Sequence, residues 1–461
     1  MTNFQIPVKV GQKIELTIDS LAAGGEAVGK HEGYTIFVPG GAPGDRLKVE
    51  IIEAKKNYGR AKILEILAPS SERINPRCPS FPDCGGCQWQ HLSYPAQLKW
   101  KKQIVIDSLT RIGGLSSDLV RDTLGMEDPW FYRNKIQYPF GLKGDQIIMG
   151  YFRQGTHQVI DLKECFIQHP YLTQIAYIVR DAVRRYKLSV YNEETHQGLL
   201  RHFIARLSFK TGEALLGLVI NGHAIPYAGR MVEEIVRDVK KNLPARIVGF
   251  VQNINTKRGN VILGEKTEAL FGENRLMEYL GGLRFQISIE SFFQVNPLQA
   301  ERLYKLVEDL SEVSKKEVVI DAYSGIGCIA LWLAPLAREI YGIEEVLEAW
   351  EDAQSNAKLN KIKNVTFGCG KVEVLLPDLL KRGVKVEIII LDPPRQGCSP
   401  KAIEAVIKTQ PKRIVYVSCN PATLARDLKV FTQSGYMVEL VQPVDMFPQT
   451  FHVEAVATLH P

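Results

Sequence analysis

The sequence predicts an α/β protein whose doubly wound parallel sheet is preceded by a small β-barrel and an α+β middle region. Short β-prone runs broken by Gly and Pro turns fill residues 8–67, and mostly strand-like runs follow over 130–285. From about residue 300, apolar strands alternate with helical segments. We therefore expect three domains, at residues 1–68, 69–285 and 286–461.

Length, composition and charge narrow the possible functions. The chain has 461 residues, of which 45% are hydrophobic and 23% charged, and this excludes wholesale disorder and fibrous repeats. No stretch approaches the ~20 apolar residues of a membrane helix, and MTNFQIPVKVGQKIEL lacks the apolar run of a signal peptide. The net charge of +6 permits an anionic partner without requiring one. We expect a cytoplasmic protein with no membrane partner.

The first region has the pattern of a small β-barrel with a basic hairpin. Its runs KIELTIDSL, YTIFVPGGAPGDRLKVEII and GRAKILEIL alternate polar and apolar residues between glycine turns. Basic residues and a tyrosine gather before the last strand, namely Lys55, Lys56, Tyr58, Arg60 and Lys62. Five-stranded barrels with such loops commonly bind oligonucleotides, and a solvated hairpin is the alternative interpretation.

Four of the eight cysteines form a candidate metal or cluster site. Cys78, Cys84 and Cys87 lie in a loop rich in Pro, Ser and Gly, and Cys165 stands alone downstream. In an intracellular chain such cysteines are metal, cluster or catalytic candidates before they are disulfides. Four thiolates can hold a [4Fe-4S] cluster, and a four-cysteine zinc site uses the same ligands. The spacing alone leaves both open.

The last region alternates strands and helices up to a final hairpin. Its apolar strands are EVVIDAYSGIG, EIYGIE, NVTFGC, KVEIIILDPP and RIVYVSCNP. The last two strand-like runs, MVELVQPVDMFPQT and HVEAVATLHP, are joined by a connection too short for a helix. An antiparallel hairpin here is typical of S-adenosylmethionine-dependent methyltransferases rather than of dehydrogenases. A helix predicted over 95–113, ended by Gly113 and Gly114, is expected to pack on this region.

The turns after the first two strands of this sheet form a candidate cofactor site. The turn Asp321-Ala-Tyr-Ser-Gly-Ile-Gly327 contains Gly325, which lets the backbone approach a ligand closely. The next strand ends in Glu344, where a carboxylate hydrogen-bonds ribose hydroxyls. The turn lacks the third glycine that seats a pyrophosphate. This favours a nucleoside ligand without phosphates, S-adenosylmethionine, over NAD.

Three further residues supply candidate chemistry. Asp392 follows a buried strand and is expected in the ligand crevice, a helix cap being the alternative. Cys419 follows the next strand, before a helix whose dipole favours a thiolate. Glu454 lies in an apolar strand, where a carboxylate is costly unless paired or functional. Together they suit methylation of uracil: Cys419 adds to carbon 6, carbon 5 takes the methyl group, and Glu454 removes the carbon-5 proton.

Six motifs in order resemble the RNA 5-methyluridine (uracil-C5) methyltransferase family over nearly the whole chain. They are Ser291-Phe-Phe-Gln294-Val-Asn296, the 321–327 turn, Gly342-Ile-Glu344, Asp392-Pro-Pro-Arg395-x-Gly397, Ser418-Cys419-Asn420-Pro421 and Asp445-Met-Phe-Pro-x-Thr450-x-His452-Val-Glu454. The resemblance implies that S-adenosylmethionine is bound by Gln294, Tyr323, Glu344 and Asp392. It also implies that Cys419 is the nucleophile and Glu454 the proton acceptor. The chain departs from many members at Cys328 and Lys371, and Cys398 is interpreted as packing.

The front half resembles the ribosomal-RNA branch of that family. The barrel looks like a TRAM domain, an RNA-binding appendage, and the four cysteines resemble the [4Fe-4S] site of that branch. The resemblance implies methylation of a uridine in 23S rRNA by a monomer with an RNA partner and no DNA partner. Two segments, Tyr132–Lys135 and Gly198–His202, also recur in the family, and their Arg and Lys side chains are candidate phosphate contacts, with surface ion pairs as the alternative.

Other functions remain alternatives. A tRNA uridine-C5 methyltransferase uses the same chemistry but generally lacks both barrel and cluster. A radical S-adenosylmethionine enzyme needs a C-x3-C-x2-C loop, and an amino-group methyltransferase needs an aromatic residue where Arg395 stands. A cytosine-5 enzyme usually carries its cysteine beside a proline in a different loop order. The non-enzymatic alternative is an RNA-binding or chaperone protein with a relic domain, against which intact Asp392, Cys419 and Glu454 argue.

Overall fold

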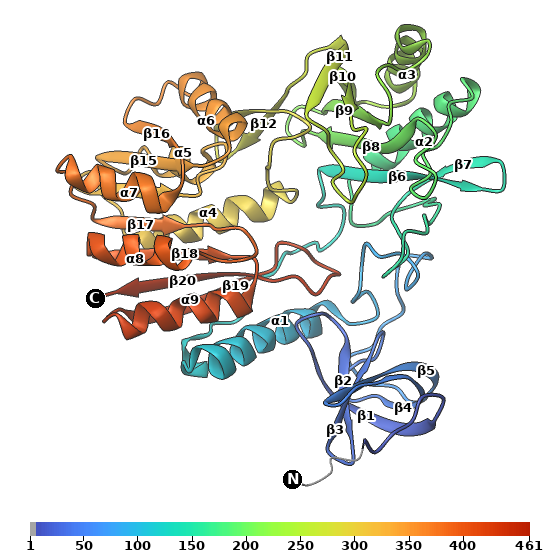
Figure 1. Cartoon of the computed structure of the whole chain (residues 1–461), viewed down its shortest axis with the longest axis horizontal. Coiled ribbons are helices and arrows are strands. Elements are labelled where there is room, and N and C mark those ends of the chain that lie inside the picture. Colours follow the sequence, from blue (N-terminus) through green and yellow to red (C-terminus); the bar gives the residue numbers. More distant parts are fainter. Residues whose placement is uncertain (1–5) are drawn as a thin grey trace.

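The computed structural model describes residues 6–461 and shows three regions along the chain (Figure 1). A barrel lies at one end, in blue; a mixed sheet with two helices follows, in green; and a larger sheet between two helical layers ends the chain, in orange and red. The predicted α/β architecture is confirmed. Residues 1–5 of the expected first domain and of the start of the chain lie outside the described residues.

The N-terminal barrel closes in the order β1-β2-β3-β5-β4. Along β1 every second residue is buried up to Ile18, as a closed small barrel requires, because alternate side chains must fill its interior. The strands are β1 (Lys13–Leu21), β2 (Ala27–His31), β3 (Tyr34–Val38), β4 (Arg46–Ala54) and β5 (Tyr58–Ala68).

The middle region is a six-stranded sheet in the order β11-β10-β9-β8-β6-β7, with one face covered by two amphipathic helices. Every residue of β8 is buried, which marks it as a central strand. The elements are β6 (Lys135–Lys143), β7 (Gln146–Met149), α2 (Pro170–Arg185), β8 (Leu200–Leu207), β9 (Glu213–Ile220), α3 (Ala228–Asn242), β10 (Arg246–Ile254) and β11 (Lys266–Gly272).

The C-terminal region is a seven-stranded sheet in the order β16-β15-β14-β17-β18-β20-β19, in which only β20 runs antiparallel to the other strands. Its strands are β14 (Val318–Ala322), β15 (Glu339–Glu344), β16 (Val365–Cys369), β17 (Ile388–Leu391), β18 (Arg413–Ser418), β19 (Met437–Val444) and β20 (Glu454–His460). A separate hairpin precedes it, formed by β12 (Leu276–Leu280) and β13 (Leu283–Ile287).

Two helical layers cover this sheet because successive strand residues point to opposite faces. Val319 packs into the core under one layer and Ile320 into the core under the other. The first layer contains α4 (Pro297–Ser311), α5 (Cys328–Leu333) and α6 (Leu347–Leu359), together with the β12–β13 hairpin. The second contains α7 (Val372–Lys381), α8 (Pro400–Thr409) and α9 (Pro421–Gln433).

The helix α1 (Tyr94–Ser108) connects the barrel to the C-terminal sheet. It continues as a π-helical turn, Leu109–Gly113, ends at Gly114 with φ +67°, and packs against α9 (Figure 1). A short 3-10 helix, Ser117–Leu119, follows. Among the residues that the structure describes, none of the helices is both long and apolar enough to span a bilayer.

Candidate active site

The turn after β14 is an open, left-handed loop. Tyr323, Gly325 and Gly327 have φ values of +70°, +53° and +87°. A Cβ atom added at Gly325 would meet nothing within 4 Å, whereas one at Gly327 would lie 2.8 Å from the Phe367 ring. Left-handed backbone at the non-glycine residue Tyr323 is costly, and such strain concentrates at functional sites. The turn therefore presents open backbone at Gly325 on a rigid base.

The predicted ribose-binding carboxylate is joined to this turn. Glu344 Oε2 accepts a hydrogen bond from Gly325 N at 2.8 Å, and its Oε1 accepts one from Val346 N at 2.8 Å. Each oxygen keeps a lone pair for a ligand hydroxyl. Nearby, Asp321 Oδ1 and Ser324 Oγ are buried without a protein partner. Unpaired buried polar atoms call for a polar ligand, so these residues fit an adenosine-type cofactor.

The terminal hairpin sets the two expected catalytic residues opposite each other. Ser418 of β18 pairs with Ala455 of β20 in antiparallel register, so that Cys419 and Glu454 are the next two residues beyond the end of this pairing. Asp392 follows β17, which lies beside β18 on its other side. Glu454 is buried and Cys419 half-buried. All three side chains therefore gather at the carboxyl edge of the sheet, where ligands of such folds bind.

Helix caps leave Asp392 free for this site. Ser399 Oγ caps α8 by accepting from Ala402 N at 3.1 Å, and this excludes the helix-cap interpretation of Asp392. Asn420 caps α9 and donates from Nδ2 to the Arg395 carbonyl at 3.1 Å. The loop after Asp392 is therefore fixed to the helix that follows Cys419.

The site gathers carboxyl groups whose ionisation is suppressed. Burial raises the pKa of Asp392 to about 7. Burial, with Asp392 adding to it, raises the pKa of Glu454 to about 8 against the opposing effect of Arg395. Burial raises the pKa of Asp321 to about 8 as well, again reinforced by Asp392. A cationic ligand such as a sulfonium would stabilise the ionised forms, and the charge of the site therefore fits S-adenosylmethionine.

The Cys419 thiol differs from the expectation based on the helix dipole. Burial, and then the nearby Glu454 and Asp392 carboxyls, raise its pKa to about 11, although Arg395 lowers it. Glu454 and Asp392 are far from Cys419 in the sequence, so the expectation took into account only the helix α9 that begins just after it. In the ligand-free protein Cys419 is therefore a thiol at neutral pH.

The two remaining predicted cofactor residues are Gln294 and Tyr323. Gln294 is buried in the segment that leads into α4. There Asn296 caps α4 and also donates to the Met446 carbonyl at 3.0 Å, which ties the segment to the terminal hairpin. Tyr323 lies beside Cys398, and burial, with Cys398 next, raises the pKa of its phenol. Cys398 is itself buried, in keeping with the packing role expected for it.

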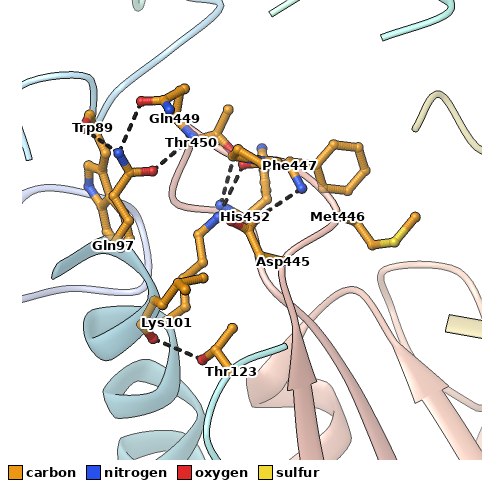
Figure 2. Close-up of polar contacts among 12 residues, drawn as sticks. Trp89, Gln97, Lys101, Thr123, Asp445, Met446, Phe447, Gln449, Thr450 and His452 are labelled. Atoms are coloured by element: carbon orange, nitrogen blue, oxygen red, sulfur yellow. Dashed lines mark hydrogen bonds and ion pairs between the residues drawn. The ribbon is translucent and has the colours of Figure 1, made fainter. Parts of the chain in front are cut away.

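Sequence reasoning did not find the buried ion pair that holds the hairpin loop. Lys101 of α1 contacts Asp445 at 2.5 Å, and neither side chain is exposed (Figure 2). Lys101 Nζ also donates to the Phe447 carbonyl at 3.1 Å, and Asp445 Oδ1 accepts from Phe447 N at 3.1 Å. The two residues are 344 positions apart, and each resembles an ordinary surface charge in the sequence. The one indication in the sequence that Asp445 is important was its place in the family motif Asp445–Glu454.

A second link joins α1 and the cysteine loop to the same hairpin loop. Gln97 Nε2 donates to Gln449 Oε1 at 3.0 Å, and Gln449 N donates back to Gln97 Oε1 at 2.9 Å (Figure 2). The Gln449 carbonyl accepts from Gln88 N and Trp89 N, just after Cys87. The loop that leads to Glu454 is therefore braced by α1 and by the chain after the cysteines.

The four candidate cluster cysteines line one small cavity that contains none of the candidate catalytic residues. Its walls include Cys78, Cys84, Cys87 and Cys165. Gly85 permits the loop, since a Cβ there would lie 2.8 Å from the Phe152 carbonyl oxygen. Within residues 6–461, however, no group of three or more His, Cys, Asp or Glu residues is arranged to hold a metal ion. The structure gathers the thiols but does not show the [4Fe-4S] site.

The candidate phosphate contacts separate in the structure. Arg133 and Lys135 line a cavity beside the 290–295 segment. Arg201 is buried and donates from Nη1 to the Asn255 and Lys257 carbonyls at 2.7 Å each. Arg201 thus serves to hold a loop rather than to contact RNA.

Comparisons with known proteins agree with this geometry. Residues 7–64 match the TRAM domain family, and residues 280–460 match the tRNA (Uracil-5-)-methyltransferase family. A protein of Halalkalibacterium halodurans called an uncharacterized RNA methyltransferase is 43% identical over 459 residues, covering 100% of this chain and 99% of that protein. A second uncharacterized RNA methyltransferase, from Listeria monocytogenes, is 43% identical over 453 residues, which cover 98% of each chain.

A solved structure extends the likeness to three dimensions. The tRNA (uracil-54, C5)-methyltransferase of Pyrococcus abyssi, in complex with S-adenosyl-L-homocysteine, has a TM-score of 0.75 and 26% identity. The match covers 97% of this chain and 100% of that one. Fold and site together define an S-adenosylmethionine-dependent methyltransferase. More narrowly, the chain belongs to the RNA uracil-5-methyltransferase family and carries an N-terminal TRAM domain.

Proposed function

We propose that the protein methylates carbon 5 of a uridine in 23S rRNA through a transient bond between Cys419 Sγ and carbon 6 of the uracil ring. The observation that carries this proposal is the β18–β20 pairing, which brings Cys419 and Glu454 together beside Asp392. A cytoplasmic location, a monomeric state and domain boundaries near residues 68 and 285 belong to the proposal.

The side chains divide the chemistry between them. Carbon 5 of uracil is too weak a nucleophile to take a methyl group unaided. The Cys419 thiol therefore first releases its proton to solvent, helped by the positive charge of the bound methyl donor, and adds as a thiolate to carbon 6, so that the ring becomes an enolate. S-adenosylmethionine supplies the methyl group that carbon 5 attacks. Glu454 then removes the carbon-5 proton, the carbon–carbon double bond re-forms, and the thiolate leaves. In this scheme Gln294, Tyr323, Gly325, Glu344 and Asp392 hold the methyl donor.

The choice of ribosomal RNA rests on the resemblance of the barrel and the four-cysteine loop to the ribosomal-RNA branch. Transfer RNA is the second candidate, since the Pyrococcus abyssi enzyme that this chain resembles acts on tRNA. The direct test gives the purified protein unmodified 23S rRNA and tRNA transcripts with a labelled methyl donor and maps 5-methyluridine by mass spectrometry. We expect transfer to 23S rRNA that Cys419→Ala abolishes. Transfer to tRNA alone would reject the ribosomal substrate, and near-normal transfer by Cys419→Ala would reject the mechanism.

The cysteine cavity is proposed to hold a [4Fe-4S] cluster. Four soft thiols around one cavity are a suitable donor set. A four-cysteine zinc site would use the same ligands, and metal analysis of the protein separates the two. Anaerobically purified protein should contain about four iron and four sulfide per chain; one zinc and no sulfide would overturn this assignment.

A further inference from the structure

A basic cavity lies at the seam between the middle sheet and the C-terminal region, and the mechanism above does not use it. Its floor comes from β6 and β8 and its wall from residues 290–295, which include most of the motif Ser291–Asn296. Its volume of about 420 Å³ is in the range of small-ligand sites, ~300–1,000 Å³. Asn134 N donates to the Val295 carbonyl at 2.8 Å across this seam, so the wall is fixed to the floor.

Several polar atoms of the residues that line the cavity lack hydrogen-bond partners within the protein. Arg206 is 2% exposed, yet its Nε and Nη1 atoms have no hydrogen-bond acceptor, and its Nη2 donates to the Ser291 carbonyl. Arg133 Nε, Tyr151 Oη and His202 Nδ1 are likewise buried without partners. All four residues line the cavity. Because guanidinium and phenol groups are hydrogen-bond donors, the cavity calls for a ligand rich in acceptors.

The charge of the cavity points to an anion. Three cationic side chains, those of Arg133, Lys135 and Arg206, line the cavity with one carboxylate, that of Glu290. Glu278, which is not among the lining residues, also acts on Arg206. Burial and then the neighbouring Arg206 and Arg133 lower the pKa of Lys135 to about 7. Cations crowded in this way gain stability when an anion binds among them.

An aromatic side chain stands at the same cavity. Phe292 is 74% exposed, although it lies between the buried residues Ser291 and Phe293. An exposed aromatic face beside cationic groups is the combination with which proteins bind single-stranded nucleotides, by stacking on the base and pairing with the phosphate.

The cavity also lies close to the reaction centre. His452 has a pKa lowered to about 4 by burial first and then by Arg395, Lys101 and Arg133. Arg395 acts on Cys419 and Glu454 as well. Tyr132, next to Arg133, donates from Oη to the Pro448 carbonyl at 3.0 Å, in the loop that leads to Glu454.

We propose that this cavity binds one unstacked nucleotide of the RNA next to the target uridine, with its phosphate on Lys135 and Arg206 and its base on Phe292. The inference rests on the proposed function, because it assumes an RNA substrate at the adjacent site. A second splayed nucleotide would hold the strand on both sides of the base that must leave its stack.

The test uses equilibrium binding of a fluorescein-labelled RNA nonamer with one central uridine, in the presence of S-adenosylhomocysteine. Lys135→Gln should weaken binding about tenfold and reduce the slope of log affinity against log salt by about 1. Phe292→Leu should also weaken binding about tenfold through lost stacking. Lys143→Gln, at the exposed end of the same strand β6, is the matched control and should change the affinity less than about twofold.

Phosphate neutralisation then locates the contact. A neutral methylphosphonate replaces one phosphate at a time around the uridine, and the affinity of each RNA is measured. At one position the replacement should weaken binding to the wild-type protein but not to Lys135→Gln, because that variant has already lost the contact. The inference would be overturned if the variants bound RNA like the wild-type protein. It would also be overturned if, at every position, the losses of affinity from the substitution and from the methylphosphonate were additive. If the wild-type protein methylates RNA but shows no such coupling, this inference alone fails. If coupling appears without methyl transfer to any RNA, the proposed function fails instead.

Discussion

At the scale of single residues, Glu454 is the group whose replacement separates the steps of the reaction. Glu454→Gln removes the proton acceptor but keeps the size of the side chain. Because methyl transfer precedes proton removal, we expect a methylated, covalent protein–RNA adduct to accumulate while turnover falls by about 10²–10⁴-fold. Denaturing gels with labelled RNA measure the adduct. Turnover above a tenth of the wild-type rate would contradict the assignment of Glu454 as base.

The raised pKa of Glu454 also predicts a pH dependence. A carboxyl group with a pKa of about 8 is mostly protonated at pH 7, and only its ionised form accepts a proton. The rate of adduct breakdown in the wild-type protein should therefore rise with pH and level off above about pH 8. Quenched-flow measurement on preformed adduct gives this rate. A flat profile, or a rate that falls as the pH rises, would remove Glu454 from this step.

At the scale of secondary-structure elements, the loop before β20 depends on α1 through the Lys101–Asp445 pair. Lys101→Met leaves the Asp445 carboxylate buried and unpaired, so the free energy of unfolding should fall by about 3–5 kcal/mol. Adding Asp445→Leu should recover part of that stability, because the buried charge is gone. We expect kcat to stay low in the double variant, since Asp445 also orders the loop by accepting from Phe447 N.

The control for this prediction lies on the same helix. Lys102 pairs with Asp122, whose side chain is 97% exposed, and Lys102→Met should cost less than about 1 kcal/mol. Denaturant unfolding and steady-state kinetics measure the two effects. If the double variant Lys101→Met, Asp445→Leu regained a normal kcat, the ion pair would contribute to stability but not to the order of the loop that catalysis needs.

The elements also show what the sequence could and could not predict. The strands and helices from β14 to α9 were predictable because each strand is an apolar run and helix caps such as Asn420 mark the starts. The hairpin was predictable from its short connection. Its insertion with β20 rather than β19 beside β18 was not, although that pairing places Glu454 opposite Cys419. The thiol pKa of Cys419 was mispredicted for the same reason: its neighbours come from distant strands.

At the scale of the whole molecule, the cysteine cavity adjoins the basic cavity. Tyr151 lines both the cysteine cavity and the basic cavity. We expect Cys165→Ser to lower iron content and weaken RNA binding more than about tenfold. The affinity for S-adenosylmethionine, whose proposed site at the carboxyl edge of the sheet contains none of the four cysteines, should change less than about twofold. Iron analysis, filter binding and calorimetry give the three values. Cys369→Ser, at an exposed cysteine, is the matched control.

The opposite pattern would contradict this role for the cysteines. Lost affinity for S-adenosylmethionine with unchanged RNA binding would mean that the cavity supports the methyl-donor site instead.

The N-terminal barrel is another candidate RNA contact of the molecule. Its basic hairpin carries surface ion pairs, such as Lys55 with Glu53 at 3.1 Å and Lys62 with Glu50 at 3.2 Å. Pairs this exposed are weak, so their cations remain able to exchange a carboxylate for a phosphate.

The most direct test of the account is the capture of substrate by sulfur 419. The wild-type protein is incubated with S-adenosylmethionine and 23S rRNA transcribed with 5-fluorouridine, whose fluorine cannot be removed as a proton. We predict a stable protein–RNA conjugate, with the modified uracil on the tryptic peptide that contains Cys419, and no conjugate with Cys419→Ala. No conjugate with the wild-type protein, or attachment at another cysteine, would contradict the account.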